Sequence, residues 1–156
     1  MLTYLTIMGT TARSADPVSI ASRLRPILLQ LNRHLRREVH PLGVTGFQVS
    51  LLASIRRQPG IGVRELAARE GISAAGISGH VDRLERAGLA QRVPGPAGDR
   101  RRIGLELTTA GERVLRLVRS RRTAWLASRL RQLEPAELEA IDAAVEPLAA
   151  LLGEDA

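Results

Sequence analysis

The segment IGVRELAAREGISAAGISGHVDRLERAGL, residues 61–89, carries the strongest structural pattern of this chain. It predicts a short helix over 63–69, which Gly71 ends, and a second helix after Ser73, whose hydroxyl can accept from a first-turn amide. Apolar residues at spacings of three and four mark the buried side of that second helix: Ile77, Val81 and Leu84. Two helices joined by the short link 70–73 predict a helix-turn-helix whose second helix is offered to solvent.

The opposite side of the second helix carries the residues expected to meet a ligand. A turn of about 100° per residue from Ile77 places five residues outward, with Ser78 on the flank: Ala75, Gly79, Asp82, Arg83 and Arg86. Small residues followed by Arg suit a major groove, because small side chains fit against base edges and Arg binds phosphates. Gly76 and Gly79 each weaken a helix by up to about 1 kcal/mol. They serve either close backbone approach to DNA or tight packing.

A basic hairpin is predicted directly after the two helices. Residues 89–93 and 103–107 flank the loop PGPAGDRRR, and Ile103, Leu105 and Leu107 alternate with Gly104 and Glu106, the period of a half-buried strand. The loop ends in Asp99, Arg100, Arg101 and Arg102. A narrow minor groove can accept an extended guanidinium, and Asp99 can hold one of these Arg side chains by a bidentate pair. Alone, such a charge run is more often simply solvated.

Amphipathic helices are predicted before this region. Residues 18–39 carry one apolar stripe: Ile20, Leu24, Ile27, Leu28, Leu31, Leu35 and Val39. Pro26 lies inside the stripe and predicts a kink there or the start of a second helix. Thr45 and Gln48 form a capping box for a helix over 46–57. The expected core face of this helix consists of Phe47, Leu51, Leu52 and Ile55.

Two further helices are predicted after the hairpin. Thr109 and Glu112 read as a second capping box for a long helix over 110–131. Pro135 fits the first turn of a final helix that reaches about Leu152 and that Pro147 interrupts late.

Composition narrows the function classes. The 156 residues carry 23 basic side chains, all of them Arg, against 16 acidic ones, for a net charge of +7 and no Cys. Without Cys the chain has no disulfide, thiol nucleophile, thiol redox sensor or Cys-ligated zinc. Seven Arg stand against Glu112 alone over 109–132, whereas the last 24 residues carry seven acids and no Arg. We expect this acidic end to lie against a basic helix, which leaves positive charge for an external anion.

Catalytic and metal-binding functions find little support. No nucleophile and base stand at a recognisable spacing, so we expect no enzyme and no cofactor. His34 and His40 are six residues apart and do not share a helix face, so no metal site is expected. His80 lies beside the buried stripe and either packs there or touches a phosphate. The apolar opening 1–8 is too short to span a membrane and lacks signal-peptide features, which favours the cytoplasm.

From Thr45 to Gly111 the sequence resembles the MarR family of winged-helix bacterial transcription regulators. The matching strings are VTGFQVSLLASI, IGVRELAAREGIS, ISGHVDRLERAGLAQR and GDRRRIGLELTTAG. The most specific pieces are HVDRLERAGL and an Asp-x-Arg wing signature followed by a Leu-Thr-x-x-Gly helix start. The signature residues are Asp99, Arg101, Leu107, Thr108 and Gly111.

The resemblance implies a mainly α fold with a small β-hairpin wing. A winged helix-turn-helix over 44–108 would be flanked by helical dimerisation segments, 17–43 and 109–156, after a poorly ordered tail, 1–16. It further implies a homodimer that binds double-stranded DNA at a near-palindromic operator. Such a dimer would act as a repressor and be released by a small aromatic or phenolic effector. A winged helix that binds nucleic acid without sequence preference and a protein-binding adaptor remain alternatives.

The resemblance also implies which residues contact DNA. In the recognition helix it implies Ala74, Ala75, Gly76, Ser78, Gly79 and Arg83, to which we add Ser73, His80 and Arg86 as further expected contacts. In the wing it implies Asp99 and Arg101, with Arg101 entering the minor groove, and we add Arg92, Arg100 and Arg102 as further expected contacts. Gly79 departs from many relatives, which have a basic residue there.

Overall fold

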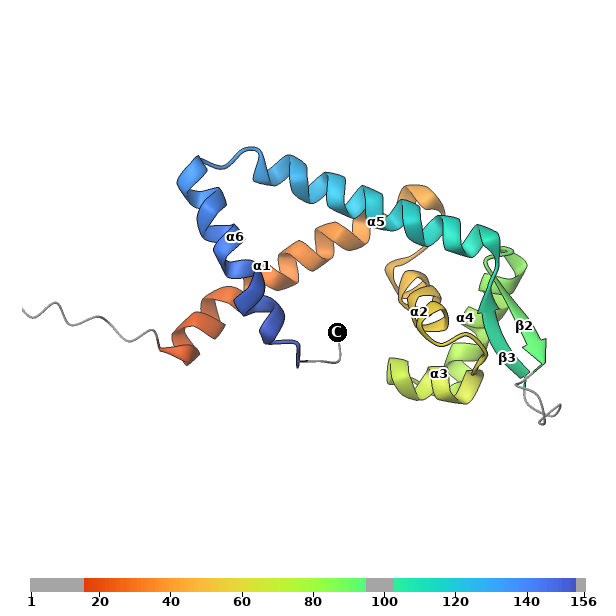
Figure 1. Cartoon of the computed structure of the whole chain (residues 1–156). Helices are drawn as coiled ribbons and strands as arrows, with labels where there is room; N and C mark the ends of the chain where they lie inside the picture. Colours follow the sequence, from red (N-terminus) through yellow and green to blue (C-terminus); the bar gives the residue numbers. More distant parts are fainter. Residues whose placement is uncertain (1–15, 95–102, 154–156) are drawn as a thin grey trace, which may run out of the picture. The chain divides into compact units, whose positions relative to one another are not determined.

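The computed structural model describes residues 16–94 and 103–153 and divides into two compact units, 1–34 and 35–156. Helix α1, Pro17–Arg37, passes from the first unit into the second. The elements that follow it are η1 (a 3₁₀ turn, His40–Leu42), α2 (Gly46–Arg57), β1 (Ile61–Gly62), α3 (Val63–Glu70), α4 (Ala74–Arg86), β2 (Ala90–Pro94), β3 (Ile103–Leu107), α5 (Thr109–Leu130) and α6 (Pro135–Ala150) (Figure 1). The mainly helical fold with a small sheet confirms the predicted class.

Helix α1 begins at a side-chain cap and continues through its proline. The Asp16 carboxylate accepts hydrogen bonds from the amides of Ser19, at 2.9 Å, and Val18, at 3.4 Å. Asp16, expected to belong to the tail, is therefore the cap of α1. The second helix predicted near Pro26 does not form, because α1 runs on to Arg37. Pro26 is exposed, so water can bond the carbonyl that the missing amide leaves without a helical donor.

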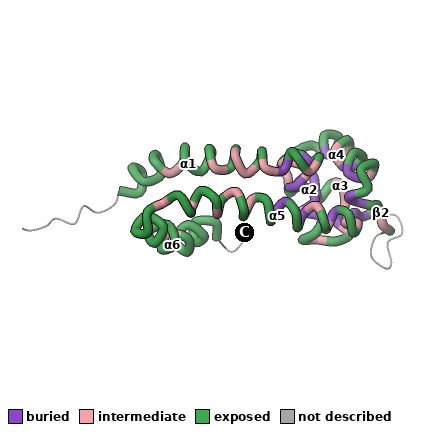
Figure 2. Tube along the Cα trace, turned by 90° about the horizontal axis from the view of Figure 1, so that it is seen from above, coloured by how far each residue is buried: buried purple, intermediate pink, exposed green. Residues whose placement is uncertain are grey.

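The core lies among α2, α3, α4 and the sheet, where Figure 2 shows the buried residues gathered. Nine large side chains and Val39 form most of it: Leu51, Leu52, Ile55, Ile61, Leu66, Ile77, Val81, Leu84 and Leu105. The predicted core face of α2 is confirmed, except that Phe47 is only half-buried. The predicted capping box is also present, since Thr45 Oγ1 accepts from the Gln48 amide at 3.2 Å and Gln48 Oε1 from the Thr45 amide at 2.8 Å.

Three antiparallel strands form one sheet in the order β1-β3-β2. The predicted hairpin is confirmed, whereas β1 was too short to be predicted. Within β3, Leu105 is fully buried as expected, but Ile103 is 59% exposed and Gly104 is buried, contrary to the predicted alternation. Gly104 is buried because β1 crosses close to it, and a Cβ there would lie 2.7 Å from Gly60 Cα. Ile103 begins the strand at the loop end, away from the core.

The start of α5 differs from prediction by one residue. Thr108, and not Thr109, is the cap, and its Oγ1 accepts from the Gly111 amide at 3.1 Å. The preceding turn decides between the two threonines, because the Thr108 amide donates to the Leu89 carbonyl at 3.2 Å and its hydroxyl donates to the Gly88 carbonyl. A Cβ at Gly111 would run into the Leu89 carbonyl oxygen. The local sequence alone could not separate the two threonines.

Helix α6 begins at Pro135, as predicted, with a capping box between Glu134 and Glu137 that the sequence reading missed. It continues through Pro147 to Ala150, so the predicted interruption is wrong. No described residue of α6 is buried, and Pro147 is exposed, which again lets water serve the unpaired carbonyl. Within residues 16–94 and 103–153, no helix combines the length and apolar content needed to cross a membrane.

Two glycine-to-alanine changes should move stability in opposite directions. Gly111→Ala should lower the free energy of unfolding by about 1–3 kcal/mol, because the new methyl group overlaps the Leu89 carbonyl. Gly79→Ala should raise it by up to about 1 kcal/mol, because a helical position gains propensity and the methyl group meets open space. Urea unfolding at one protein concentration checks both. Equal effects of the two changes would contradict the packing at Gly111.

Candidate nucleic-acid interface

Helix α4 presents the face that its sequence predicted. Ile77, Val81 and Leu84 are buried, while the expected outward residues are exposed and Ser78 is half-buried on the flank. The exposed set is Ala75, Gly79, Asp82, Arg83 and Arg86, joined by Ser73, Ala74 and Gly76 at the start of the helix. One element therefore brings together all nine predicted recognition-helix residues, with eight of them exposed or on the flank and His80 turned toward α2.

The polar side chains at the start of α4 are used by the helix itself. Ser73 Oγ accepts from the Gly76 amide at 3.1 Å, which confirms it as the cap. The Ser78 hydroxyl donates to the Ala74 carbonyl at 2.8 Å. A hydroxyl has one hydrogen, so Ser78 can offer an outside ligand only its acceptor lone pairs.

The two glycines of α4 have different surroundings. A Cβ built on Gly79 would meet no atom of the described residues within 4 Å, so tight packing does not explain this glycine. A Cβ on Gly76 would lie 3.1 Å from Ser73 Oγ, which makes Gly76 a close neighbour of the cap. Close approach of the backbone to DNA at Gly79 stays a prediction.

His80 packs against α2 and holds Arg83. Its ring meets the Phe47 ring edge to face, with centroids 4.7 Å apart and planes at 75°. Arg83 Nη2 lies 2.8 Å from His80 Nδ1. Because a guanidinium only donates, Nδ1 accepts this bond. Of the two roles predicted for His80, packing beside the buried stripe is thus confirmed.

Arg92 contacts carboxylates of α4. Its Nη2 lies 2.9 Å from Asp82 Oδ1 and 3.3 Å from Glu85 Oε2. The other predicted wing residues, Asp99, Arg100, Arg101 and Arg102, lie outside the described residues. The structure therefore describes the base of the wing, formed by β2 and β3, and not its tip.

Comparisons with known proteins agree with this architecture. The MarR family model matches residues 42–102. An HTH-type transcriptional regulator of Mycobacterium tuberculosis is 27% identical over 148 residues, which cover 95% of this chain and 99% of that protein. The regulator Tm0710 of Thermotoga maritima is 27% identical with a TM-score of 0.73, covering 86% of this chain and 94% of that one. The resemblance to the MarR family that the sequence predicted is confirmed over residues 42–102.

A further MarR-fold neighbour was solved with DNA. It is a mutant of S. aureus MepR bound to an oligodeoxyribonucleotide, 22% identical with a TM-score of 0.66, covering 85% of this chain and 96% of that one. The family model, the regulators of similar sequence and the shared fold together support the interpretation of this chain as a transcriptional regulator with a DNA-binding winged helix, and not as an enzyme.

The MarR-type helix-turn-helix is held in place by a polar cluster that the sequence reading missed. The Glu70 carboxylate accepts from the hydroxyls of Ser50, at 2.8 Å, and the fully buried Ser54, at 2.7 Å. These bonds fix the end of α3 to α2, directly before Gly71 turns the chain in a left-handed conformation with φ 67°. Ser50 and Ser54, four residues apart on one helix face, were the available signal.

A pair of Arg side chains joins α5 to the end of α1. Arg121 Nε donates to the Glu38 carbonyl at 2.9 Å, and Arg122 Nε donates to the Leu35 carbonyl at 3.2 Å. Cations near the last carbonyls of a helix are stabilised by its dipole. Burial, together with the charge of Arg36, lowers the pKa of Arg122, although its guanidinium stays charged at neutral pH.

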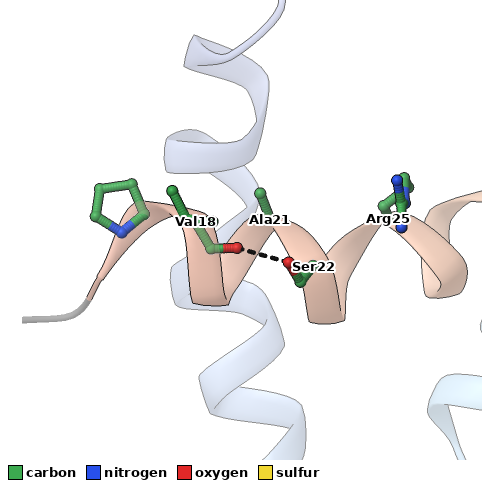
Figure 3. A pocket seen from close by; sticks show the side chains of 5 residues that line it. Val18, Ala21, Ser22 and Arg25 are labelled. Carbon is green, nitrogen blue, oxygen red and sulfur yellow. Dashed lines mark hydrogen bonds between the residues drawn. The ribbon is translucent and has the colours of Figure 1, made fainter.

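The described residues give little support for a metal or small-molecule site. Among the residues that the structure describes, no three His, Asp or Glu side chains gather as metal ligands would. A shallow depression lies on α1, lined by Pro17, Val18, Ala21, Ser22 and Arg25 (Figure 3). All five are exposed, and the Ser22 hydroxyl is bonded to the Val18 carbonyl at 2.9 Å, so the depression lacks the enclosure of a ligand site.

Substitution of His80 should separate its two contacts. His80→Phe keeps an aromatic ring against Phe47 but removes the Nδ1 acceptor, so thermal stability should change little while Arg83 loses its partner. His80→Ala removes both and should lower the free energy of unfolding by about 1 kcal/mol more than His80→Phe, the range of an aromatic pair. Differential scanning calorimetry checks the difference. Equal unfolding temperatures would show that the ring contact contributes nothing.

Proposed function

We propose that this chain is a homodimeric repressor that binds a near-palindromic operator, with α4 of each protomer in the major groove and the wing in the adjacent minor groove. The exposed face of α4 carries this proposal, since it combines small side chains with Arg83 and Arg86 on the side opposite a fully buried stripe. The net charge of +7 favours a polyanion as partner.

Direct contacts from this helix to base edges should contribute little to sequence specificity. Ala74, Ala75, Gly76 and Gly79 lack the groups that make bidentate contacts, each of which is worth about 1–3 kcal/mol of discrimination. Ser78 has already given its hydrogen to Ala74. Sequence preference should therefore come largely from groove width beneath the Arg101 wing, which favours A·T-rich flanks. The open space at Gly79 would let the backbone of α4 approach the DNA closely.

The unburied apolar faces of α1 and α6 support a dimer. Neither helix has a buried residue, although both carry large aliphatic side chains that are exposed. These include Val18, Ile20, Ile27, Leu28 and Leu29 in α1, and Leu138, Ile141, Val145 and Leu148 in α6. Such contiguous apolar surface is rarely left to water, and a second copy of the chain would cover it. The acidic α6 could also lie against the Arg-rich α5 of the partner.

The two-fold symmetry of such a dimer predicts the form of the operator. Each α4 would read one half of an inverted repeat, with half-sites about one helical turn apart. Release by a small aromatic or phenolic effector completes the proposal and follows the family resemblance. The protein would then act in the cytoplasm, where bacterial DNA lies.

The dimer and its operator can be tested together. Ile141→Glu places a charge on the apolar face of α6 and should give a monomer that loses operator binding. Ala143→Glu adds the same charge about 200° around that helix and should leave the dimer intact. Light scattering gives the mass, and footprinting on duplexes selected from a random pool should show an inverted repeat. A stable wild-type monomer or a single unsymmetrical half-site would contradict the proposal.

The wing can be tested by its dependence on salt. Arg101→Ala should weaken binding to the selected duplex and lower the slope of log affinity against log salt by about one phosphate equivalent. Asp99→Ala should have a smaller effect in the same direction, because it removes only the positioning of the Arg side chain. Fluorescence anisotropy at several salt concentrations measures both. If both variants bind like the wild type, the wing does not touch DNA.

A further inference from the structure

Arg92 joins the wing to the recognition helix through two carboxylates. It lies in β2, two residues before Pro94 ends that strand, and its partner in β3 is Leu105. One nitrogen, Nη2, lies within 3.3 Å of both Asp82 and Glu85, which are three residues apart on α4. The described base of the wing is thus tied to the helix proposed to enter the major groove.

The two carboxylates stand where a DNA-binding surface is least tolerant of negative charge. Asp82 belongs to the exposed face of α4, with 52% of its side chain accessible, beside Arg83 and Arg86. A carboxylate at this place repels phosphate groups unless a cation neutralises it. Arg92 reaches Asp82 from another element, with its Nη2 2.9 Å from Asp82 Oδ1.

We infer that Arg92 is a positioning residue: it neutralises Asp82 and Glu85 and fixes the wing to α4, and it does not itself bind phosphate. This inference rests on the proposed function and replaces the direct DNA contact that the sequence suggested for Arg92. Arg92 raises the affinity for DNA only because it neutralises these two carboxylates. Removing those carboxylates should therefore remove most of the requirement for Arg92.

A mutant cycle on the full chain tests this dependence. The variants are Arg92→Gln, the pair Asp82→Asn with Glu85→Gln, and all three changes together, while Arg131→Gln at the end of α5 is the matched loss of one cation. Anisotropy measures binding to a duplex that the wild type selects from a random pool and to a scrambled duplex. Hydrogen exchange of the free proteins follows the β2 and β3 amides. Circular dichroism verifies that each variant folds.

The expected pattern is asymmetric. Arg92→Gln should weaken binding at least about fivefold in the wild-type background and less than about twofold when Asp82 and Glu85 are already neutral, a coupling of the size seen between contacting residues. It should speed exchange of the β2 and β3 amides, and Arg131→Gln should not. The same loss in both backgrounds would show that Arg92 binds phosphate directly. No loss in the wild-type background, or unchanged exchange, would also overturn the inference.

These outcomes are distinct from failure of the proposed function. If the wild type selects no duplex and prefers neither probe, the operator proposal fails. The mutant cycle can then still be measured. Binding to the scrambled duplex reports whether Arg92 neutralises the two carboxylates, and amide exchange in β2 and β3 reports whether it fixes the wing to α4. If the wild type selects an inverted repeat but the cycle shows no coupling between Arg92 and the two carboxylates, the operator proposal is supported and the positioning role of Arg92 is wrong.

Discussion

The burial of one side of α4 sets which residues of that helix are exposed. Ile77, Val81 and Leu84 are fully enclosed, and each contributes about 1.5–3 kcal/mol relative to an exposed side chain. A helix that buries this stripe must turn its opposite side outward. The exposure of Ala75, Gly79, Arg83 and Arg86 is therefore a consequence of packing, and the interface can carry small residues and Arg without loss of core.

Polar contacts fix the orientation of neighbouring helices and strands, which apolar burial alone does not determine. Glu70 ties the end of α3 to two serines of α2, His80 ties α4 to Phe47, and Arg92 ties β2 to α4. Exposed ion pairs contribute little to stability, so their value lies in geometry. Each contact joins elements distant in sequence around the helix proposed to read DNA. Ser73 and Ser78 likewise bond the backbone of α4, and for this reason the proposed readout relies on the shape of the DNA.

The resemblance to MarR regulators and the packing of the residues independently indicate a winged helix-turn-helix. Residues 42–102 match the family model, and they include the buried stripe of α4 together with β1 and β2, whereas β3 begins directly after the match. The flanking helices lie outside that match, and their exposed aliphatic faces carry the proposal of a dimer. The winged helix supplies the DNA-binding element, and the outer helices would set the spacing of two such elements.

The sequence by itself determined the local structure of this protein. Apolar periodicity predicted α2, α3 and α4, and side-chain caps at Thr45 and Ser73 placed their starts, because these signals act within a few residues. Only the tertiary structure decided between Thr108 and Thr109, since the choice depends on the carbonyls of Gly88 and Leu89. It also decided that Gly104 is buried and that Arg92 faces Asp82, because both depend on which distant backbone or carboxylate folding brings alongside.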